Sequence, residues 1–317
     1  MTATWTAEEL VATLPQMEWR LLTPEHGGLW QTYLHDYSLP KESDGFEHYV
    51  GRLDSAGFDI VVQAWQPKNP TATAYIAHGY YDHVGLYRHL IWYCLKRGWR
   101  VITFDLPGHG LSSGERSSID SFQQYDEVFD DVLTHIQQNF NEPIHTFGQS
   151  TGGAILINYL LKRGIKAVDS PFASVSLMAP LVRPKEWRKA FWLHKLLRRW
   201  VRQMKRGRSV NSSDQSFLDF LWHNDPLQAS LLSVPWVGAM KEWVHFIEAQ
   251  PATDVDVNIV QGDDDNTVAW RHNLNILAQK FPQQNLKIIE GGRHHLVNES
   301  EDIRLQIWNF LDKEIHA

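Results

Sequence analysis

A short turn bounded by glycines constrains this chain more than any other feature. Residues 148–152 read Gly-Gln-Ser-Thr-Gly, which is the Gly-x-Ser-x-Gly pattern of a nucleophile elbow. Residues 143–147 predict a short buried strand before it, and residues 154–161 predict an apolar helix after it. Glycine suits both flanks, because the turn strains the backbone and brings helix and strand too close for a β-carbon. This context favours an elbow with Ser150 at its apex over a tight turn without chemistry.

A serine hydroxyl is a weak nucleophile, so a catalytic serine needs a base and a carboxylate that orients the base. With such an elbow, the expected chain order is serine, acid, histidine. Residues 255–260 and 285–290 each predict a strand that ends in a polar loop. These loops hold three candidate acids and two candidate bases: Asp263, Asp264, Asp265, His294 and His295. The alternatives are a solvated turn and a polar surface, but the chain order and the strand ends favour a triad.

Four blocks resemble those of one enzyme family. Residues 78–83 read His-Gly-Tyr-Tyr-Asp-His and resemble its HG-x-x-E-H segment, and residues 104–114 resemble its D-x-x-GHG-x-S-x-G block. The third block is the elbow, and the fourth joins Gly-x-x-Asp-x-x-Val at residues 262–268 to His-x-x-x-Asn-Glu at residues 294–299. Over residues 50–315 the chain thus resembles an α/β-hydrolase of the monoacylglycerol lipase and lysophospholipase branch, which is often labelled serine aminopeptidase-like.

The resemblance implies which candidates act. In this branch the acid lies three residues after the glycine of its block, which selects Asp265, and the base lies five residues before the glutamate, which selects His294. Three positions depart from the usual pattern: Gln149 replaces a histidine, Thr151 replaces a methionine, and His295 stands where an acidic residue is common. None of these departures removes a group that the chemistry needs.

The fold implied by the resemblance also supplies two backbone donors for the negative oxygen of a tetrahedral intermediate. One is the amide of Thr151, and the other is the amide of Tyr80, which follows the strand expected at residues 73–77. Four further residues are candidates for lining the substrate pocket: His78, Gly79, Tyr81 and Gln149. His78 could instead serve as a base, but hydrogen bonds that hold its loop are the favoured interpretation.

Composition limits the class of protein. The chain has 317 residues, 43% of them hydrophobic, which suffices for a large core and suits one domain with an insertion. No uninterrupted apolar stretch is long enough to span a membrane, and the first residues begin neither a signal peptide nor a lipidation motif. The 16 histidines lack metal-ligand spacing, and neither a phosphate loop nor a dinucleotide fingerprint is present. We therefore expect a cytoplasmic protein without a metal or cofactor.

Alternating strands and helices predict an α/β fold with a mostly parallel central sheet flanked by helices. The expected strands are residues 58–65, 73–77, 100–105, 143–149 and 172–179, and the expected helices are residues 86–97, 121–139 and 151–163. The alternation stops at residue 183 and resumes at residue 255. We therefore expect a core of residues 1–182 and 251–317 with a helical cap inserted at residues 183–250. The leader begins with a capping box at residues 6–9 and is irregular but packed over residues 20–50.

The expected cap carries a basic amphipathic segment. Residues 185–209 hold ten Lys or Arg and one Glu, whereas the whole chain has 30 basic and 37 acidic residues. Apolar residues at three- and four-residue spacing predict one helix with a broad apolar face and cationic flanks. Such a helix suits an anionic membrane surface, and the alternative is a lid whose arginines are merely solvated. Nucleic-acid binding is not expected, because the rest of the chain is strongly acidic.

Together these features predict a serine hydrolase that cleaves carboxylic esters, small or lipid-like, through an acyl-enzyme. The lipid preference rests on the resemblance, which names monoacylglycerols and lysophospholipids, and on the amphipathic cap. The alternatives are an aminopeptidase or amidase on the same triad, which would need an acidic cluster for a free amino group, and a non-catalytic receptor that keeps the fold.

Overall fold

A mostly parallel eight-stranded sheet forms the centre of the molecule in the computed structural model, which describes residues 5–16, 28–207 and 209–315. The strands are β1 (Glu47–Ser55), β2 (Phe58–Gln66), β3 (Thr73–Ala77), β4 (Arg100–Phe104), β5 (Ile144–Gln149), β6 (Ser174–Met178), β9 (Val257–Gly262) and β10 (Gln284–Ile289). They lie in the order β1-β2-β4-β3-β5-β6-β9-β10; β2 is antiparallel to both of its neighbours, β1 and β4, and all other neighbouring strands are parallel. The α/β class expected from the sequence is confirmed.

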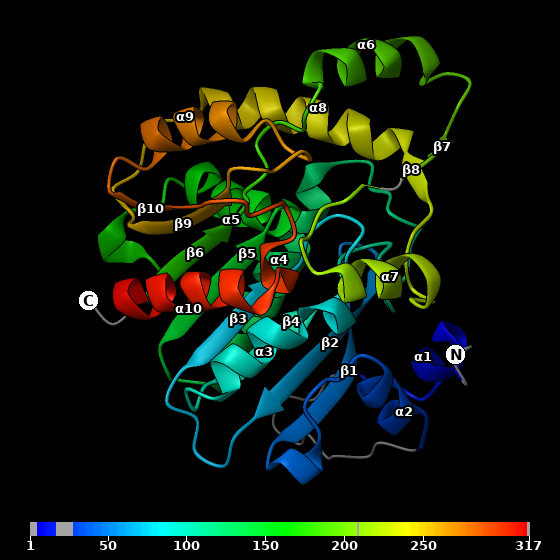
Figure 1. The fold of residues 1–317 in the computed structure, drawn as a ribbon, viewed down its shortest axis with the longest axis vertical. Helices are drawn as coiled ribbons and strands as arrows, with labels where there is room; N and C mark the ends of the chain where they lie inside the picture. The colour runs from blue at the N-terminus through cyan, green and yellow to red at the C-terminus, as the bar shows by residue number, and fades with distance from the viewer. Residues whose placement is uncertain (1–4, 17–27, 208, 316–317) are drawn as a thin grey trace.

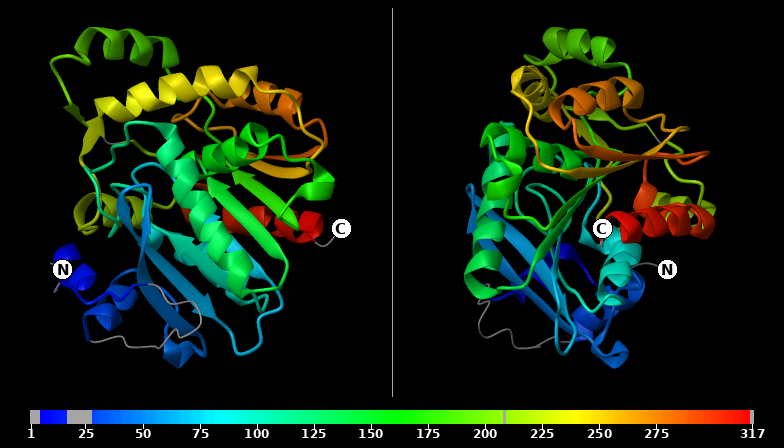
Figure 2. Two further views of the ribbon diagram at one scale, coloured as in Figure 1. Left: turned by 180° about the vertical axis from the view of Figure 1, so that it is seen from behind. Right: turned by 90° about the vertical axis from the view of Figure 1, so that its left-hand side faces the viewer.

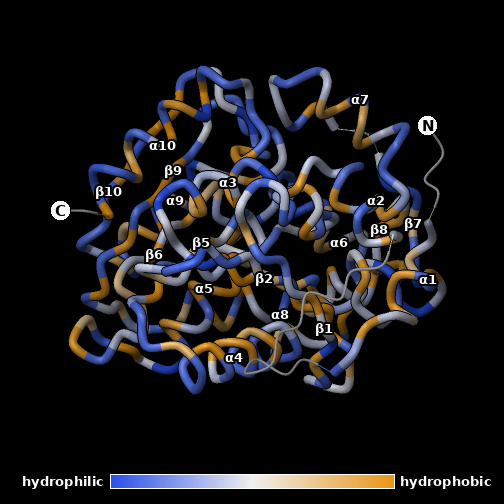
Figure 3. Tube along the Cα trace, turned by 90° about the horizontal axis from the view of Figure 1, so that it is seen from below, coloured by the Kyte–Doolittle hydropathy of each residue, from blue (hydrophilic) through white to orange (hydrophobic). Residues whose placement is uncertain are grey.

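Helices cover both faces of this sheet (Figures 1 and 2). The helices are α1 (Ala7–Ala12), α2 (Gly28–Asp36), α3 (Arg88–Leu95), α4 (Phe122–Asn139), α5 (Thr151–Lys162), α6 (Trp187–Leu197), α7 (Gln215–His223), α8 (Val234–Ala249), α9 (Trp270–Lys280) and α10 (Glu301–Ile315). One core cluster lies under α4, α5 and α8, and the other joins α3 and α10 to the N-terminal helices α1 and α2. Along α10, at the edge of the molecule, hydrophobic and hydrophilic residues alternate as expected for a helix with one buried face (Figure 3).

Every strand and helix expected between residues 58 and 179 is present, with ends that differ by at most two residues. These segments are readable because the strands are short and rich in apolar, aromatic and β-branched residues, and the helices are amphipathic or wholly buried. The capping box of the leader is also present, with reciprocal hydrogen bonds between Thr6 and Glu9. The irregular leader expected at residues 20–50 is only partly testable, because residues 17–27 lie outside the described residues.

That expectation is wrong for the end of the leader, because β1 begins at Glu47. The strand carries polar residues and a glycine, so its own pattern is weak. It forms because it pairs with β2 along its whole length, from Glu47 opposite Gln66 to Ser55 opposite Phe58. The two turn residues, Ala56 and Gly57, both have positive φ angles, of 52° and 79°. This is the geometry of a two-residue hairpin turn, whose twist matches that of the flanking strands.

The basic segment at residues 185–209 is not one helix, which corrects the sequence-based expectation. Helix α6 ends at Leu197, and the chain then turns into a short strand, β7 (Gln203–Lys205), which pairs with β8 (Leu231–Ser233). A continued helix would place Lys195, Arg198 and Arg202 at three- and four-residue spacing, where like charges repel. Pairing with β8 satisfies the backbone instead. Residue 208 and the side chain of Leu193 are outside the description.

Within residues 183–250 the described structure is otherwise helical: α6 contacts α8, whereas α7 lies apart from α6 (Figure 1). Helix α8 packs on α4 and α5, where Trp243 stacks on Phe122 and its indole donates to Asn158 Oδ1 at 3.1 Å. Helix α6 lies on the outer side of α8 (Figure 1). Among the described residues, no helix has the length and apolar character needed to cross a bilayer.

Candidate active site

The carboxyl ends of the parallel strands bring the expected loops together. Ser150 stands between β5 and α5 with φ 53° and ψ −111°, which is a strained conformation for a residue with a β-carbon. Glycines make this turn possible: a β-carbon on Gly152 would lie 2.0 Å from the Ala77 carbonyl oxygen, and one on Gly148 would lie 2.6 Å from Gly152. The serine is therefore held by packing at the point where helix α5 begins.

His294 lies within hydrogen-bond distance of Ser150. Its Nε2 is 2.9 Å from Ser150 Oγ, and its Nδ1 is 2.8 Å from Asp265 Oδ2. The three residues come from the loops after β5, β9 and β10, and all three are buried. The Gln149 side chain donates to the backbone carbonyl of His294 at 2.8 Å, so this departure from the family pattern holds the histidine loop in place. The arrangement suits a relay in which the imidazole accepts the serine proton.

Asp265 is the aspartate that its loop turns inward. Its Oδ1 accepts hydrogen bonds from the amides of Thr267 and Val268 at 2.8 and 3.1 Å, and Gln261 Nε2 donates to Oδ2 at 3.0 Å. Burial raises the pKa of Asp265, but His294 and these donors outweigh burial and lower it. The carboxylate is therefore ionised and fixed toward the imidazole. The Gln261 contribution was not foreseen from the sequence, because a buried glutamine within a strand carries no motif.

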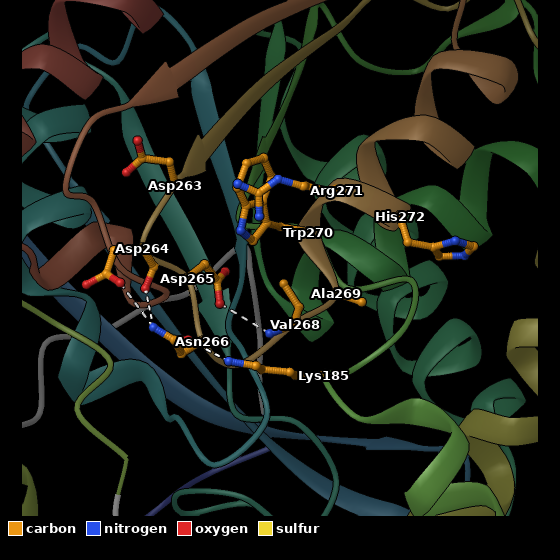
Figure 4. Close-up of a pocket in the computed structure, with 10 residues that line it drawn as sticks. All are labelled: Lys185, Asp263, Asp264, Asp265, Asn266, Val268, Ala269, Trp270, Arg271 and His272. Carbon is orange, nitrogen blue, oxygen red and sulfur yellow. Dashed lines mark hydrogen bonds between the residues drawn. The ribbon is translucent and has the colours of Figure 1, made fainter.

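The neighbouring aspartates point elsewhere. Asp263 accepts from the Gly291 amide at 2.7 Å, and Asp264 binds Arg293 and Asn266. Figure 4 shows the three carboxylates diverging, with only Asp265 directed at the Val268 amide. The hollow drawn there, of about 290 Å³, is lined by Lys185 and by residues 263–266 and 268–272, without Ser150 or His294.

The two residues whose amides are expected to stabilise an oxyanion line one cavity together with Ser150. Thr151 is the first residue of α5, where helix amides lack intrahelical acceptors, and Tyr80 follows β3. Within the described part of the chain, neither amide donates to another residue. The Tyr80 side chain is engaged separately: its hydroxyl donates to the Ser117 carbonyl at 2.7 Å, and its ring stacks on Trp236. Both amides are thus available to a ligand.

A cavity of about 250 Å³ opens beside Ser150 and His294. Of the four pocket candidates, Tyr81 and Gln149 line it, whereas His78 and Gly79 are absent from the described lining, which corrects that expectation. His78 is fully buried: it accepts from the Leu106 amide at 2.9 Å and lies 2.8 Å from the Gly79 carbonyl. Burial lowers its pKa to about 3. His78 therefore holds the loop as a neutral imidazole.

The rest of the lining was not identified from the sequence. Segments within residues 183–250 contribute Pro184, Arg206, Gly207, Ser209, Asn211, Leu232 and Trp236. The sequence pattern of this segment does not indicate which residues face the serine, because the path of the chain there depends on the turn after α6 and on the pairing of β7 with β8.

His295 and Asp82 form a buried pair beside the same cavity. His295 Nε2 lies 3.1 Å from Asp82 Oδ1, and the Tyr87 hydroxyl donates to Asp82 Oδ2 at 2.9 Å. Tyr87 in turn accepts from the Gly79 amide at 2.9 Å, which connects the pair to the loop that carries Tyr80. The histidine that departs from the family pattern thus has a carboxylate partner. Both residues belong to motifs noted in the sequence, but nothing in their spacing indicated that their side chains are in contact.

This elbow, a serine–histidine–aspartate hydrogen-bond chain and a parallel sheet with helices on both faces define the α/β-hydrolase class. The model of the family described as serine aminopeptidase, S33, matches residues 68–301, and the chain belongs to that family. A solved monoacylglycerol lipase of Paleococcus ferrophilus superposes with a TM-score of 0.69 at 19% identity, covering 81% of this chain and 98% of the other.

Two curated relatives are also similar in sequence. A monoglyceride lipase of Mus musculus is 29% identical over 79% of this chain and 84% of its own length. An abhydrolase domain-containing protein of Dictyostelium discoideum is 26% identical over 81% of this chain, which spans about a quarter (26%) of that longer protein. The resemblance inferred from the four sequence blocks is therefore confirmed at the level of the family.

The His294 environment predicts a pH dependence. Burial lowers the pKa of His294, but the charge and hydrogen bond of Asp265 outweigh burial and raise it above its ordinary value of 6.5. A histidine must be neutral to accept a proton, so activity is lost as the pH falls through this raised pKa. We expect kcat/KM for p-nitrophenyl butyrate to rise with pH to a plateau, with its acidic midpoint above 6.5. A midpoint below that value would contradict the assigned role of Asp265.

Proposed function

We propose that this protein hydrolyses carboxylic esters through a Ser150 acyl-enzyme, and that its substrates are lipid-like monoacyl esters. The observation that carries the proposal is the continuous hydrogen-bond chain from Asp265 through His294 to Ser150, open to a cavity between the core and residues 183–250. The names of the mouse and Paleococcus proteins support the lipid part of the proposal.

Each residue then has a defined step. His294 Nε2 takes the proton from Ser150 Oγ as the oxygen attacks the ester carbonyl, and Asp265 stabilises the imidazolium that forms. The amides of Tyr80 and Thr151 donate to the oxyanion. His294 then protonates the departing alcohol, and the acyl group stays on Ser150. Water, activated by the same imidazole, attacks the acyl-enzyme and releases the acid.

The cavity lining suits an ester with an apolar portion. Leu181, Leu232, Val268 and Trp236 supply apolar surface beside the serine. The aminopeptidase alternative needs free carboxylates to bind an ammonium group, and Asp82 is the one acid among the described lining residues. Asp82 is already engaged by His295 and Tyr87. A panel of p-nitrophenyl esters from acetyl to palmitoyl beside aminoacyl anilides tests the proposal, which requires ester cleavage to dominate.

We also propose that residues 183–250 act as a cap on a hydrolase core of residues 1–182 and 251–317, and that α6 contacts anionic membrane from the cytoplasmic side. Three apolar side chains on α6 or just after its end are exposed: Trp192 at 64%, Leu196 at 72% and Trp200 at 85%. Exposed cations flank them, including Lys195, Arg198 and Arg199. Exposed tryptophan beside cations suits the boundary between lipid head groups and acyl chains.

The membrane contact is testable by charge reversal. We expect combined Lys195→Glu, Arg198→Glu and Arg199→Glu to weaken binding to phosphatidylglycerol vesicles by about a hundredfold at low salt, since each cation near an anionic surface contributes about 1 kcal/mol. We expect the variant to hydrolyse a long-chain ester in those vesicles more slowly, in proportion to its weaker binding. Turnover of p-nitrophenyl butyrate stays unchanged, because these side chains do not line the cavity.

The matched control reverses three exposed lysines far from α6 along the chain: Lys68, Lys96 and Lys166. It changes net charge equally and should leave vesicle binding nearly intact. Wild-type protein that does not bind the vesicles at low salt, or equal weakening by both triple variants, would contradict the membrane role.

A further inference from the structure

Arg206 occupies an unusual position between two cavities. It follows β7, and its backbone amide donates to the Ser230 carbonyl at 3.0 Å, which fixes the chain there. Its guanidinium lies 3.8 Å from the centre of the Tyr81 ring. The residue lines the cavity of about 250 Å³ that contains Ser150, and it also lines a neighbouring cavity of about 760 Å³ bounded by Leu221 and Asp225. Arg206 therefore faces the space in which a substrate of Ser150 would lie.

The hydrogen bonding of this guanidinium is incomplete. Only Nη1 donates, to Gln228 Oε1 at 2.7 Å and to the Ala229 carbonyl at 3.3 Å. In the described part of the chain, no carboxylate comes within 4.0 Å of Arg206, and Nε and Nη2 have no acceptor. By contrast, Arg202 pairs with Glu115 at 3.0 Å and Arg183 with Glu248 at 2.6 Å.

The free donors form the edge of the guanidinium that recognises anions. Nε and Nη2 lie side by side in one plane, and this edge binds a carboxylate or phosphate through two parallel hydrogen bonds. Burial lowers the pKa of Arg206, yet a guanidinium keeps its charge. The charge of a half-buried cation is not balanced when no counterion lies beside it. An anionic group of a ligand therefore gains more binding free energy there than beside an exposed arginine.

Asp82 is the carboxylate that lines the Ser150 cavity together with Arg206, and it is committed elsewhere. Both of its oxygens are engaged, Oδ1 by His295 and Oδ2 by Tyr87. Burial raises the pKa of Asp82, but His295 and the other partners outweigh burial and lower it, so the carboxylate is ionised within that pair. The positive charge of Arg206 thus remains available in the cavity.

We propose that Arg206 binds an anionic group, phosphate or carboxylate, on the alcohol portion of the ester that Ser150 cleaves. The inference rests on the proposed function, because it places the anion on a substrate of Ser150. The apolar wall of Leu232 and Trp236 accepts the acyl portion, and the Arg206 edge fixes the charged end. The preferred substrates are then monoacyl esters with an acidic head group, ahead of neutral monoacylglycerols of equal chain length.

Binding to the full-length Ser150→Ala protein tests this without catalysis. The probes are 1-O-dodecylglycerol 3-phosphate, its carboxylate counterpart 3-O-dodecylglycerate, and neutral 1-O-dodecylglycerol, each measured by calorimetry below its micelle concentration. We expect the phosphate or the carboxylate probe to bind about ten- to a hundredfold more tightly than the neutral one, as charge-assisted hydrogen bonds permit. The stronger of the two anionic probes identifies the group.

Variants of Arg206 distinguish binding of the anion at this residue from non-specific electrostatic attraction to the protein. Adding Arg206→Gln should remove the preference for anionic probes. Arg206→Lys should keep part of this preference, because lysine retains the positive charge but lacks the two parallel donors of the guanidinium. Lys205→Gln is the matched control: this neighbouring cation does not line the Ser150 cavity, so the preference should persist. Circular dichroism establishes that each variant is folded.

Three results would overturn the proposal: equal binding of neutral and anionic probes, equal loss of preference in Lys205→Gln and Arg206→Gln, or competition by inorganic phosphate alone at the affinity of the alkyl phosphate. The last would identify a site for free phosphate. Because the probes are ethers, a failure of ester hydrolysis would leave this measurement unaffected, and the two hypotheses fail separately.

Discussion

Ser150→Ala is expected to lower turnover of p-nitrophenyl butyrate by about six orders of magnitude and to abolish covalent labelling by a fluorophosphonate probe. The variant removes the oxygen that lies 2.9 Å from His294 Nε2, while the strained turn and the neighbouring amides remain. Residual activity then reflects the oxyanion donors and binding alone. Steady-state kinetics and gel fluorescence measure the two effects on the same preparation.

Ser176→Ala is the matched control for this change. Ser176 is buried in β6, and its hydroxyl has no partner among the described residues, so its loss removes an oxygen of the same kind without touching the relay. This control should retain labelling and turnover. Undiminished labelling of Ser150→Ala would place the nucleophile elsewhere.

Asp265→Asn is expected to lower kcat by about four orders of magnitude. An amide in place of the carboxylate cannot stabilise the imidazolium, and it favours the wrong tautomer of His294, with which Asp265 forms a 2.8 Å hydrogen bond. Asp264→Asn is the matched change one residue away. Its carboxylate is exposed and binds Arg293 and Asn266, so we expect it to alter kcat little. Comparable losses in the two variants would mean that the register taken from the motif is wrong.

His294 and His295 are also neighbours of which only one belongs to the triad, but replacing His295 has a structural effect of its own. His294→Ala should abolish turnover, whereas His295→Ala removes the partner of buried Asp82. Leaving a buried charge unpaired costs about 3–5 kcal/mol of stability. We therefore expect His295→Ala to lower the melting temperature while the folded fraction retains substantial kcat.

The sequence could predict features that depend on local pattern. Strand β3 is an apolar run after its first residue, and the elbow needs its glycines because Gly152 lies directly against Ala77. The resemblance of the acid and histidine loops to the family's blocks implies Asp265 and His294, the two residues that the structure brings to Ser150.

Features that depend on contacts between distant segments could not be predicted. Strand β1 exists through its pairing with β2, and α6 ends where repulsion between cations and the β7–β8 pairing outweigh its helical periodicity. The Asp82–His295 pair joins residues 213 positions apart. Arg206 looked like one more cation of an amphipathic helix, and only its place against Tyr81 distinguishes it.

Direct observation of the acyl-enzyme tests the central claim. Protein mixed with p-nitrophenyl butyrate, quenched in acid within the first turnovers and digested, should yield a peptide carrying one butyryl group on Ser150 by tandem mass spectrometry. In Asp265→Asn the same adduct should form far more slowly. A butyryl group on another residue, or full turnover without any acylated peptide, would contradict the account.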